Sequence, residues 1–96
     1  MLFRSEYARR GIRCVSISPG AVMTPMIRAT LAEQGGAAAL ANRTPLGRIG
    51  NPEEIAAATL WMCSPAASFV TATDLLVDGG IDALAAFADP WPMPAE

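Results

Sequence analysis

The sequence I-R-C-V-S-I-S-P-G-A-V-M-T-P, from Ile12 to Pro25, contains the sharpest change of chemistry in the chain. Its first six residues are mostly apolar and β-branched, which is typical of a strand buried on both faces of a parallel sheet. Ser18–Gly20 should then leave the strand, because proline donates no ladder hydrogen bond and glycine allows a positive φ. Thr24 and Pro25 indicate a helix start, with threonine as N-cap and proline in the first position. We therefore expect a buried strand, a loop at its carboxyl end, where open α/β sheets bind ligands, and a helix N-terminus.

A helix and a second strand follow. Asn51, Pro52 and Glu54 read as an N-cap, a first-position proline and a capping-box glutamate. They predict a helix over residues 51–63 with an apolar stripe wide enough to be buried. Residues 69–80 predict the last strand, because an apolar run is followed there by Asp-Gly-Gly.

Three blocks of the sequence resemble the short-chain dehydrogenase/reductase family. They are the strand and proline-glycine loop of residues 12–25, the block T-P-L-G-R-I-G-N-P-E-E-I-A from Thr44 to Ala56, and the block S-F-V-T-A-T-D-L-L-V-D-G-G from Ser68 to Gly80. Their order and spacing make the resemblance specific. It implies an α/β fold: the C-terminal part of a Rossmann-type doubly wound parallel sheet, with two strands plus helices, incomplete as a domain.

The resemblance also implies a coenzyme site. In the family the proline-glycine loop closes over the nicotinamide half of NAD or NADP. Carried over to this chain, Pro19 and Gly20 let the backbone approach the coenzyme closely, and Val22 presents its backbone groups to the nicotinamide carboxamide. Thr24 offers its hydroxyl to the carboxamide or the adjoining phosphate, at a helix N-terminus that favours an anion. The residues alone leave a structural alternative open, with Thr24 as a simple N-cap and Pro19-Gly20 as a simple turn.

Two further regions are assigned by the same resemblance. Residues 26–43 are expected to form two short helical pieces separated by Gly35-Gly36, and they correspond to the family's substrate lid, for which a glycine hinge is suited. An ordinary helix-loop-helix connection explains them equally well. Residues 81–96 are expected to be a tail, because closely spaced prolines forbid regular structure near its end. The family usually has glycine in place of Ala72, which predicts a tighter backbone approach or a strained turn there.

No catalytic residue is assigned. The family's glycine-rich loop and Ser-Tyr-Lys set precede the matched region, and this chain contains neither lysine nor histidine. The resemblance implies an NAD(P)-dependent oxidoreductase acting on a small-molecule alcohol or carbonyl substrate. We expect this chain alone to be inactive, and we do not expect it to bind the coenzyme by itself. The alternative is a non-catalytic oligomerisation or binding fragment of a former dehydrogenase.

Composition narrows the possible partners. Hydrophobic residues make up 52% of the chain and charged residues 17%, which suggests a piece of a larger core, and the resemblance implies a homo-oligomer. The net charge of −2 gives no reason to expect nucleic acid or an anionic membrane. No apolar leader core or run of ~20 apolar residues is present, so we expect a cytoplasmic location. Cys14 and Cys63 fit no metal-ligand spacing and are expected to be buried free thiols.

Overall fold

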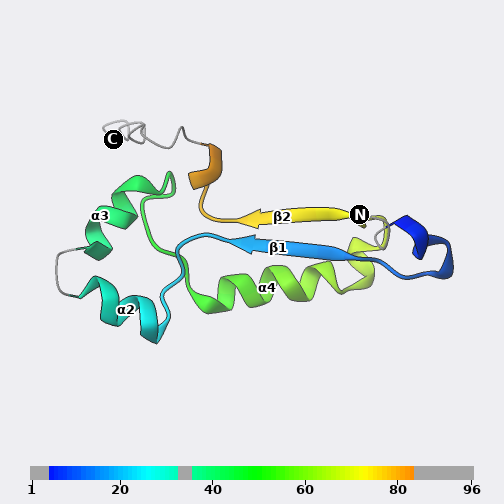
Figure 1. The fold of residues 1–96 in the computed structure, drawn as a ribbon, viewed down its shortest axis with the longest axis horizontal. Helices are drawn as coiled ribbons and strands as arrows, with labels where there is room; N and C mark the ends of the chain where they lie inside the picture. The colour runs from blue at the N-terminus through cyan, green and yellow to red at the C-terminus, as the bar shows by residue number, and fades with distance from the viewer. Residues whose placement is uncertain (1–4, 33–35, 84–96) are drawn as a thin grey trace.

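The computed structural model describes residues 5–32 and 36–83 of the chain (Figure 1). Its helices and strands, in chain order, are η1 (Ala8–Arg10), β1 (Val15–Pro19), α2 (Pro25–Leu31), α3 (Gly36–Arg43), α4 (Pro52–Met62), η2 (Pro65–Ala67), β2 (Thr73–Val77) and η3 (Ile81–Ala83). Of the expected tail, residues 81–83 form η3 and residues 84–96 lie outside the described part.

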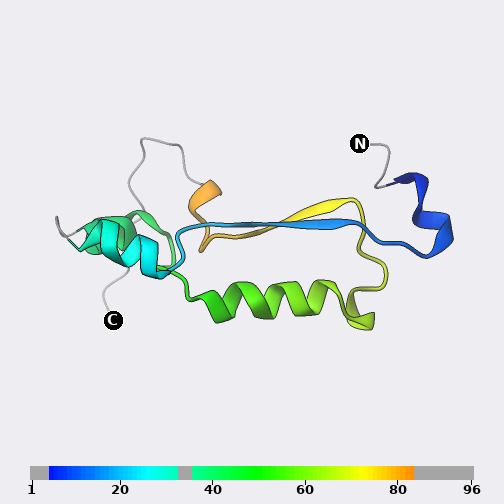
Figure 2. The same cartoon turned by 60° about the horizontal axis from the view of Figure 1, so that its bottom comes forward.

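The two strands form a parallel sheet. The register runs from Val15 opposite Thr73 to Pro19 opposite Val77. The chain between them crosses over through α4, which runs along one face of the sheet (Figure 2). Parallel strands need such a crossover, and the arrangement confirms the expected α/β class with two parallel strands plus helices.

The strand boundaries differ from the sequence prediction. The first strand begins at Val15 rather than Ile12 and continues to Pro19 instead of ending before Ser18. Proline is tolerated there because the parallel ladder uses its neighbour, and the N–H of Gly20 donates to the Val77 carbonyl at 3.0 Å. The last strand begins at Thr73 rather than near residue 69, since Ala72 has a left-handed φ of 58° that interrupts extended backbone.

Arg13 forms hydrogen bonds at the amino end of the two strands. Its guanidinium donates to the carbonyl oxygens of Met62 at 2.8 Å, Val70 at 3.1 Å and Ser64 at 3.4 Å. The Met62 carbonyl is one of the last carbonyls of α4, which have no partner within the helix, whereas Val70 lies shortly before β2. Arg13 therefore joins the carboxyl end of α4 to the segment that leads into β2. Met62 and Ala67, the buried apolar residues of the described part, lie in the same corner. The core of the described chain is therefore small and sits where α4 meets η2.

Only one face of the sheet is covered by the described residues. Ser16 and Ser18 of β1 and Asp74 of β2 lie on the other face, and both hydroxyls donate to Asp74 Oδ1, at 2.6 and 2.9 Å. The hydrogen bond from Ser16, followed by that from Ser18, lowers the pKa of the Asp74 carboxyl. Leu76 on this face remains 50% exposed. The prediction of cover on both faces of the strands is therefore wrong for the described part of the chain.

The strained backbone at Ala72 gives a stability prediction. A left-handed conformation costs an L-residue roughly 1–2 kcal/mol, whereas glycine adopts it without a Cβ clash but loses more chain entropy on folding. We expect Ala72→Gly to raise the free energy of unfolding by about 1 kcal/mol in urea denaturation. Ala57→Gly in the interior of α4 is the matched control and should lower it by about 1 kcal/mol. A lower stability for both variants would contradict the strain at Ala72.

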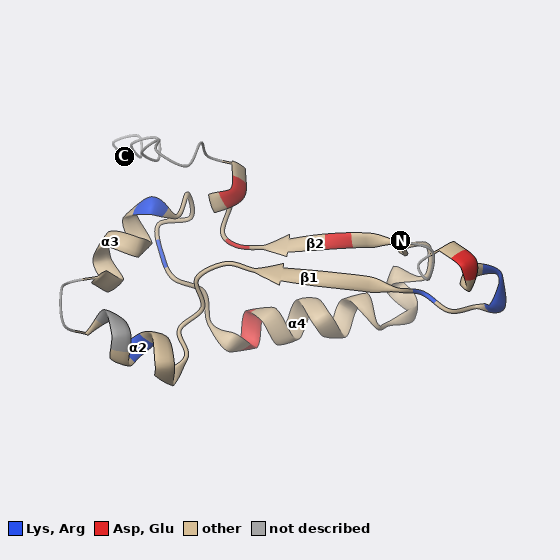
Figure 3. Ribbon diagram, viewed as in Figure 1, with Lys and Arg blue, Asp and Glu red and all other residues tan. Residues whose placement is uncertain are grey.

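The surface of α4 is apolar beyond its first turn. Glu53 and Glu54 are the charged residues of this helix, and Figure 3 shows no charged segment along the rest of it. Of the apolar stripe expected to be buried, Met62 is 2% exposed, whereas Leu60 is 74% exposed and Cys63 is also exposed, so the described residues cover the stripe only in part. The neighbouring Trp61 is 45% exposed. Within residues 5–32 and 36–83, no helix is long and apolar enough to cross a membrane.

Candidate functional site

The loop that follows β1 starts with a close backbone contact. Gly20 lies against Asp78, which follows β2, and a Cβ built on Gly20 would meet Asp78 Cα and Cβ at 2.7 Å. Only glycine fits at this separation. The carboxyl ends of the two strands are thereby held side by side, and the loop leaves the sheet from a fixed point.

A second contact orients the middle of the loop. Val22 forms an isolated parallel bridge with Gly50. The Gly50 N–H donates to the Ala21 carbonyl at 2.9 Å, and the Met23 N–H donates to the Gly50 carbonyl at 2.9 Å. In a parallel bridge of this type the central residue's own N–H and C=O point to the opposite side. The backbone groups of Val22 are therefore turned away from Gly50.

The loop ends at the start of α2. The N–H of Ile27 donates to Thr24 Oγ1 at 3.3 Å, and Pro25 occupies the first helical turn. Thr24 is thus an N-cap, as the sequence predicts. Its hydroxyl oxygen accepts this bond and its O–H hydrogen can still donate to another group.

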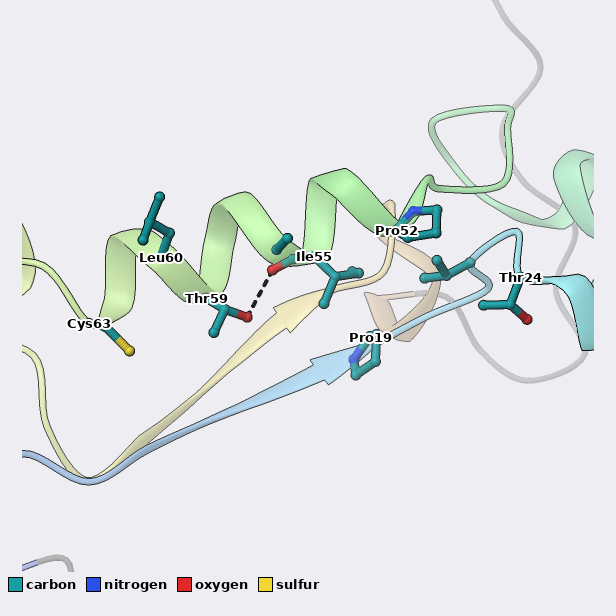
Figure 4. A pocket seen from close by; sticks show the side chains of 9 residues that line it. Pro19, Thr24, Pro52, Ile55, Thr59, Leu60 and Cys63 are labelled. Atoms are coloured by element: carbon teal, nitrogen blue, oxygen red, sulfur yellow. Dashed lines mark hydrogen bonds between the residues drawn. The ribbon is translucent and has the colours of Figure 1, made fainter.

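Three of the four residues expected at the site share one groove. Pro19, Val22 and Thr24 form one wall and α4 supplies the other, so that the two walls line an open, largely apolar groove of about 650 Å³ (Figure 4). The helix wall consists of Pro52, Ile55, Ala56, Thr59, Leu60 and Cys63. Gly20 does not line this groove because it is turned toward Asp78.

The two cysteines are free thiols in the described structure. Cys14 is half-buried, whereas Cys63 is exposed. The expected burial is therefore wrong for Cys63, because this residue lies on the groove, which the described residues leave open.

A forked ion pair lies beside the loop. Arg48 Nη1 donates to Glu54 Oε1 and Nη2 to Oε2, both at 2.7 Å. The backbone N–H of Asn51 also donates to Glu54 Oε1, at 2.9 Å, which is the glutamate half of the expected capping box. This ion pair is not among the predictions from the sequence. The feature of the sequence that could have indicated it is an arginine six residues before the capping glutamate.

These contacts make stability depend on pH. The Arg48 fork, followed by the Asn51 N–H, lowers the pKa of Glu54 from 4.5 to about 2. A carboxylate whose pKa is lower in the folded chain stabilises the fold above the unfolded pKa, and this contribution disappears as the pH falls through the folded pKa. We expect the difference in urea midpoint between the wild type and Glu54→Gln to be constant from pH 7 to 5. It should shrink below pH 4.5 and be lost near pH 2.

Glu53→Gln is the matched control for this titration, since Glu53 is the adjacent carboxylate in the same helical turn. A difference from the wild type as large as that of Glu54→Gln, or one that persists at pH 2, would contradict the role of the fork.

The geometry defines a class of protein. A parallel β-α-β unit with a loop and a helix N-terminus at the carboxyl ends of its strands is the building unit of α/β proteins, and in the doubly wound α/β sheets ligands bind at this end. The family model described as enoyl-(acyl carrier protein) reductase matches residues 4–82. The chain is 47% identical over 76 residues to 3beta-hydroxysteroid dehydrogenase 1 of Eggerthella lenta, covering 79% of this chain and 29% of that protein.

Solved structures of dehydrogenases are also similar to this chain. Gluconate 5-dehydrogenase from Burkholderia cenocepacia, in complex with NADP and tartrate, has a TM-score of 0.75 at 33% identity, over 84% of this chain and 32% of that one. The structure of 4-hydroxyisoleucine dehydrogenase complexed with NADH has a TM-score of 0.79 at 25% identity. The match covers 86% of this chain and 34% of that one. The chain belongs to the short-chain dehydrogenase/reductase family and matches part of its Rossmann-type domain. It spans about a third or less of the length of these relatives.

Proposed function

We propose that this chain supplies the nicotinamide side of an NAD(P) site in an oxidoreductase that acts on a small-molecule alcohol or carbonyl compound. The observation that carries the proposal is the bridge between Val22 and Gly50, which turns the backbone N–H and C=O of Val22 away from the protein's own ladder. Two relatives of known structure hold NADP or NADH. One of them holds NADH and the other NADP, so the proposal includes both coenzymes.

The residues of the loop fit this role. A carboxamide carries one acceptor and two donor hydrogens, and the Val22 N–H and C=O offer the complementary pair. The Thr24 O–H can donate to the carboxamide or to the adjoining phosphate, next to the positive end of the α2 dipole. Pro19 adds an apolar side chain to the wall of the groove. When bound, the nicotinamide would accept or donate a hydride.

The proton chemistry lies outside this chain. Its sequence has no lysine and no histidine, and the tyrosine and lysine that the family uses for acid-base chemistry precede the region that this chain matches. We therefore propose that the chain binds and orients but does not itself catalyse. Its isolated affinity for the coenzyme should be weak, and a residue-resolved measurement is needed to detect it.

The test is a nuclear magnetic resonance titration of the full 96-residue chain. Nicotinamide mononucleotide at millimolar concentration should shift the amide signals of Val22, Met23 and Thr24. Adenosine monophosphate is the matched ligand control and should leave them unchanged, because this loop meets only the nicotinamide half. Thr24→Val should lose the shifts and Thr24→Ser, which keeps the hydroxyl, should retain them. Equal shifts with both nucleotides, or none near the loop, would overturn the proposal.

A second function is favoured by the uncovered apolar surface. Leu60 is 74% exposed and Trp61 45%, on the helix that forms the groove wall. We propose as the alternative that the chain is a non-catalytic module that associates with copies of itself through α4. Sedimentation equilibrium should then show a dimer or larger species that Leu60→Asp dissociates. Leu46 is 69% exposed and lies outside α4, so Leu46→Asp should leave the dimer intact. A wild-type monomer at high micromolar concentration would exclude this alternative.

A further inference from the structure

One carboxylate joins two segments that surround the candidate site. Glu54, in the first turn of α4, accepts three hydrogen bonds, two from the Arg48 guanidinium at 2.7 Å and one from the Asn51 N–H at 2.9 Å. The side chain of Arg48 is 53% exposed and that of Glu54 41% exposed. Both oxygens are thus engaged, and the forked geometry restrains the arginine more tightly than a single bond would.

The residues held by this carboxylate flank Gly50. Arg48 precedes Gly50, Asn51 follows it, and both are tied to the same side chain of a regular helix. Gly50 in turn bonds on either side of Val22, through the Ala21 carbonyl and the Met23 N–H. Hydrogen bonds from Glu54 to residues 48 and 51, the backbone that joins these residues to Gly50, and the two bonds of Gly50 therefore connect α4 to the loop.

We infer that Glu54 is a positioning residue, which acts through Arg48 and Asn51 to hold Gly50 against the loop and so to fix the orientation of Val22. The inference deepens the proposed function and rests on it for the identity of what Val22 faces. The bridge itself, and its dependence on Glu54, are properties of the chain without any ligand.

The bridge needs such support. It consists of two neutral backbone hydrogen bonds, each of which contributes only about 0.5–1.5 kcal/mol net, while fixing one residue's backbone costs roughly 1–2 kcal/mol. Two bonds alone do not hold a loop of several residues in one conformation. Hydrogen bonds to a charged group are roughly twice as strong as neutral ones, and water reduces this gain at a pair as exposed as Arg48 and Glu54. Three such bonds act together here to restrain residues 48–51.

A simple helix cap is the competing explanation, and the two make different predictions. A cap stabilises α4 and, through it, the fold as a whole, so its loss should speed exchange at the bridge amides and at other protected amides alike. A positioning residue instead protects the amides of Gly50 and Met23, which lie on the bridge and outside the helix. The amides of Gly20 and Ala72, which bond across the sheet to Val77 and Cys14, should be unaffected and serve as internal references.

The experiment is amide hydrogen exchange followed by nuclear magnetic resonance on the full chain. Glu54→Gln should speed exchange at Gly50 and Met23 at least tenfold relative to the reference amides. Arg48→Lys, which keeps the charge but not the fork, should speed it about threefold and leaves the helix start intact. Glu53→Gln, with the same loss of charge in the same helical turn, should change these amides less than twofold.

Selective exchange at the bridge in Glu54→Gln and Arg48→Lys, but not in Glu53→Gln, supports the inference. Unchanged bridge amides, or equal acceleration at the bridge and the reference amides in both Glu54→Gln and Arg48→Lys, would overturn it. The nicotinamide mononucleotide titration separates it from the proposed function. If the wild type shows no shifts, the coenzyme role fails while exchange still decides the positioning role. If it shows them, Glu54→Gln should need about tenfold more nucleotide for the same shift.

Discussion

Replacing Gly20 by alanine is expected to lower the free energy of unfolding by about 3 kcal/mol, at the upper end of the range for overpacked sites. The new Cβ would lie 2.7 Å from Asp78 Cα and Cβ and 3.2 Å from its carbonyl oxygen. Backbone atoms cannot rotate out of the way as the end of a side chain can. The carboxyl ends of β1 and β2 would therefore have to separate, and the N–H of Gly20 would lose its bond to the Val77 carbonyl.

Gly50→Ala is the matched control for this substitution. A Cβ at Gly50 would meet its nearest neighbour, the Ala21 carbonyl oxygen, at 3.5 Å, which is an ordinary contact. Urea denaturation should thus place the Gly50 variant within about 1 kcal/mol of the wild type and the Gly20 variant well below it. Equal stabilities for the two variants would show that Gly20 and Asp78 do not lie as close as described.

Replacing Gly79 by alanine should cost roughly 2–4 kcal/mol, because a left-handed φ and a steric clash act at the same residue. Gly79 has a φ of 66°, and its Cβ would lie 2.5 Å from Thr44 Cγ2. Thr44 is only 5% exposed, and its hydroxyl donates to the Leu40 carbonyl at 3.0 Å, so it has little room to move.

Gly47→Ala separates the two causes. Gly47 also has a positive φ, of 81°, but nothing lies within 4 Å of the Cβ position. Its substitution should cost only the roughly 1–2 kcal/mol of the left-handed conformation. Thermal unfolding of the two variants in parallel measures the steric part as their difference. A Gly79 variant no less stable than the Gly47 variant would exclude the contact with Thr44.

Local signals predicted the helix starts well and the strand ends poorly. Thr24-Pro25 and Asn51-Pro52 start α2 and α4, because capping depends on neighbouring residues that the sequence displays directly. The strands were misplaced because their limits depend on the partner strand. Pro19 stays in β1 since Gly20, and not proline, donates to Val77. Alanine at position 72, where the family usually has glycine, predicted either a tighter backbone approach or a strained turn, and the left-handed φ of 58° supports the strained turn.

The candidate site was predictable only as a set of residues. Pro19, Val22 and Thr24 come from one short stretch, and the structure places them on one wall. The other wall and the bridge come from residues far along the chain, and nothing in the sequence near Val22 points to Gly50. The expectation that Gly20 lies beside the coenzyme stays a prediction. Its contact with Asp78 joins the ends of two separate strands, which local sequence pattern cannot reveal.

The bridge between Val22 and Gly50 also has a consequence for how the sequence can change. It closes the base of a long excursion of the chain that includes α2 and α3. Because each doubling of a loop's length adds only about 0.6 kcal/mol of closure entropy, segments of different length and composition can be exchanged above this base at small thermodynamic cost. The segment between Val22 and Gly50 can therefore vary in length and sequence while the bridge keeps the backbone of Val22 in its orientation.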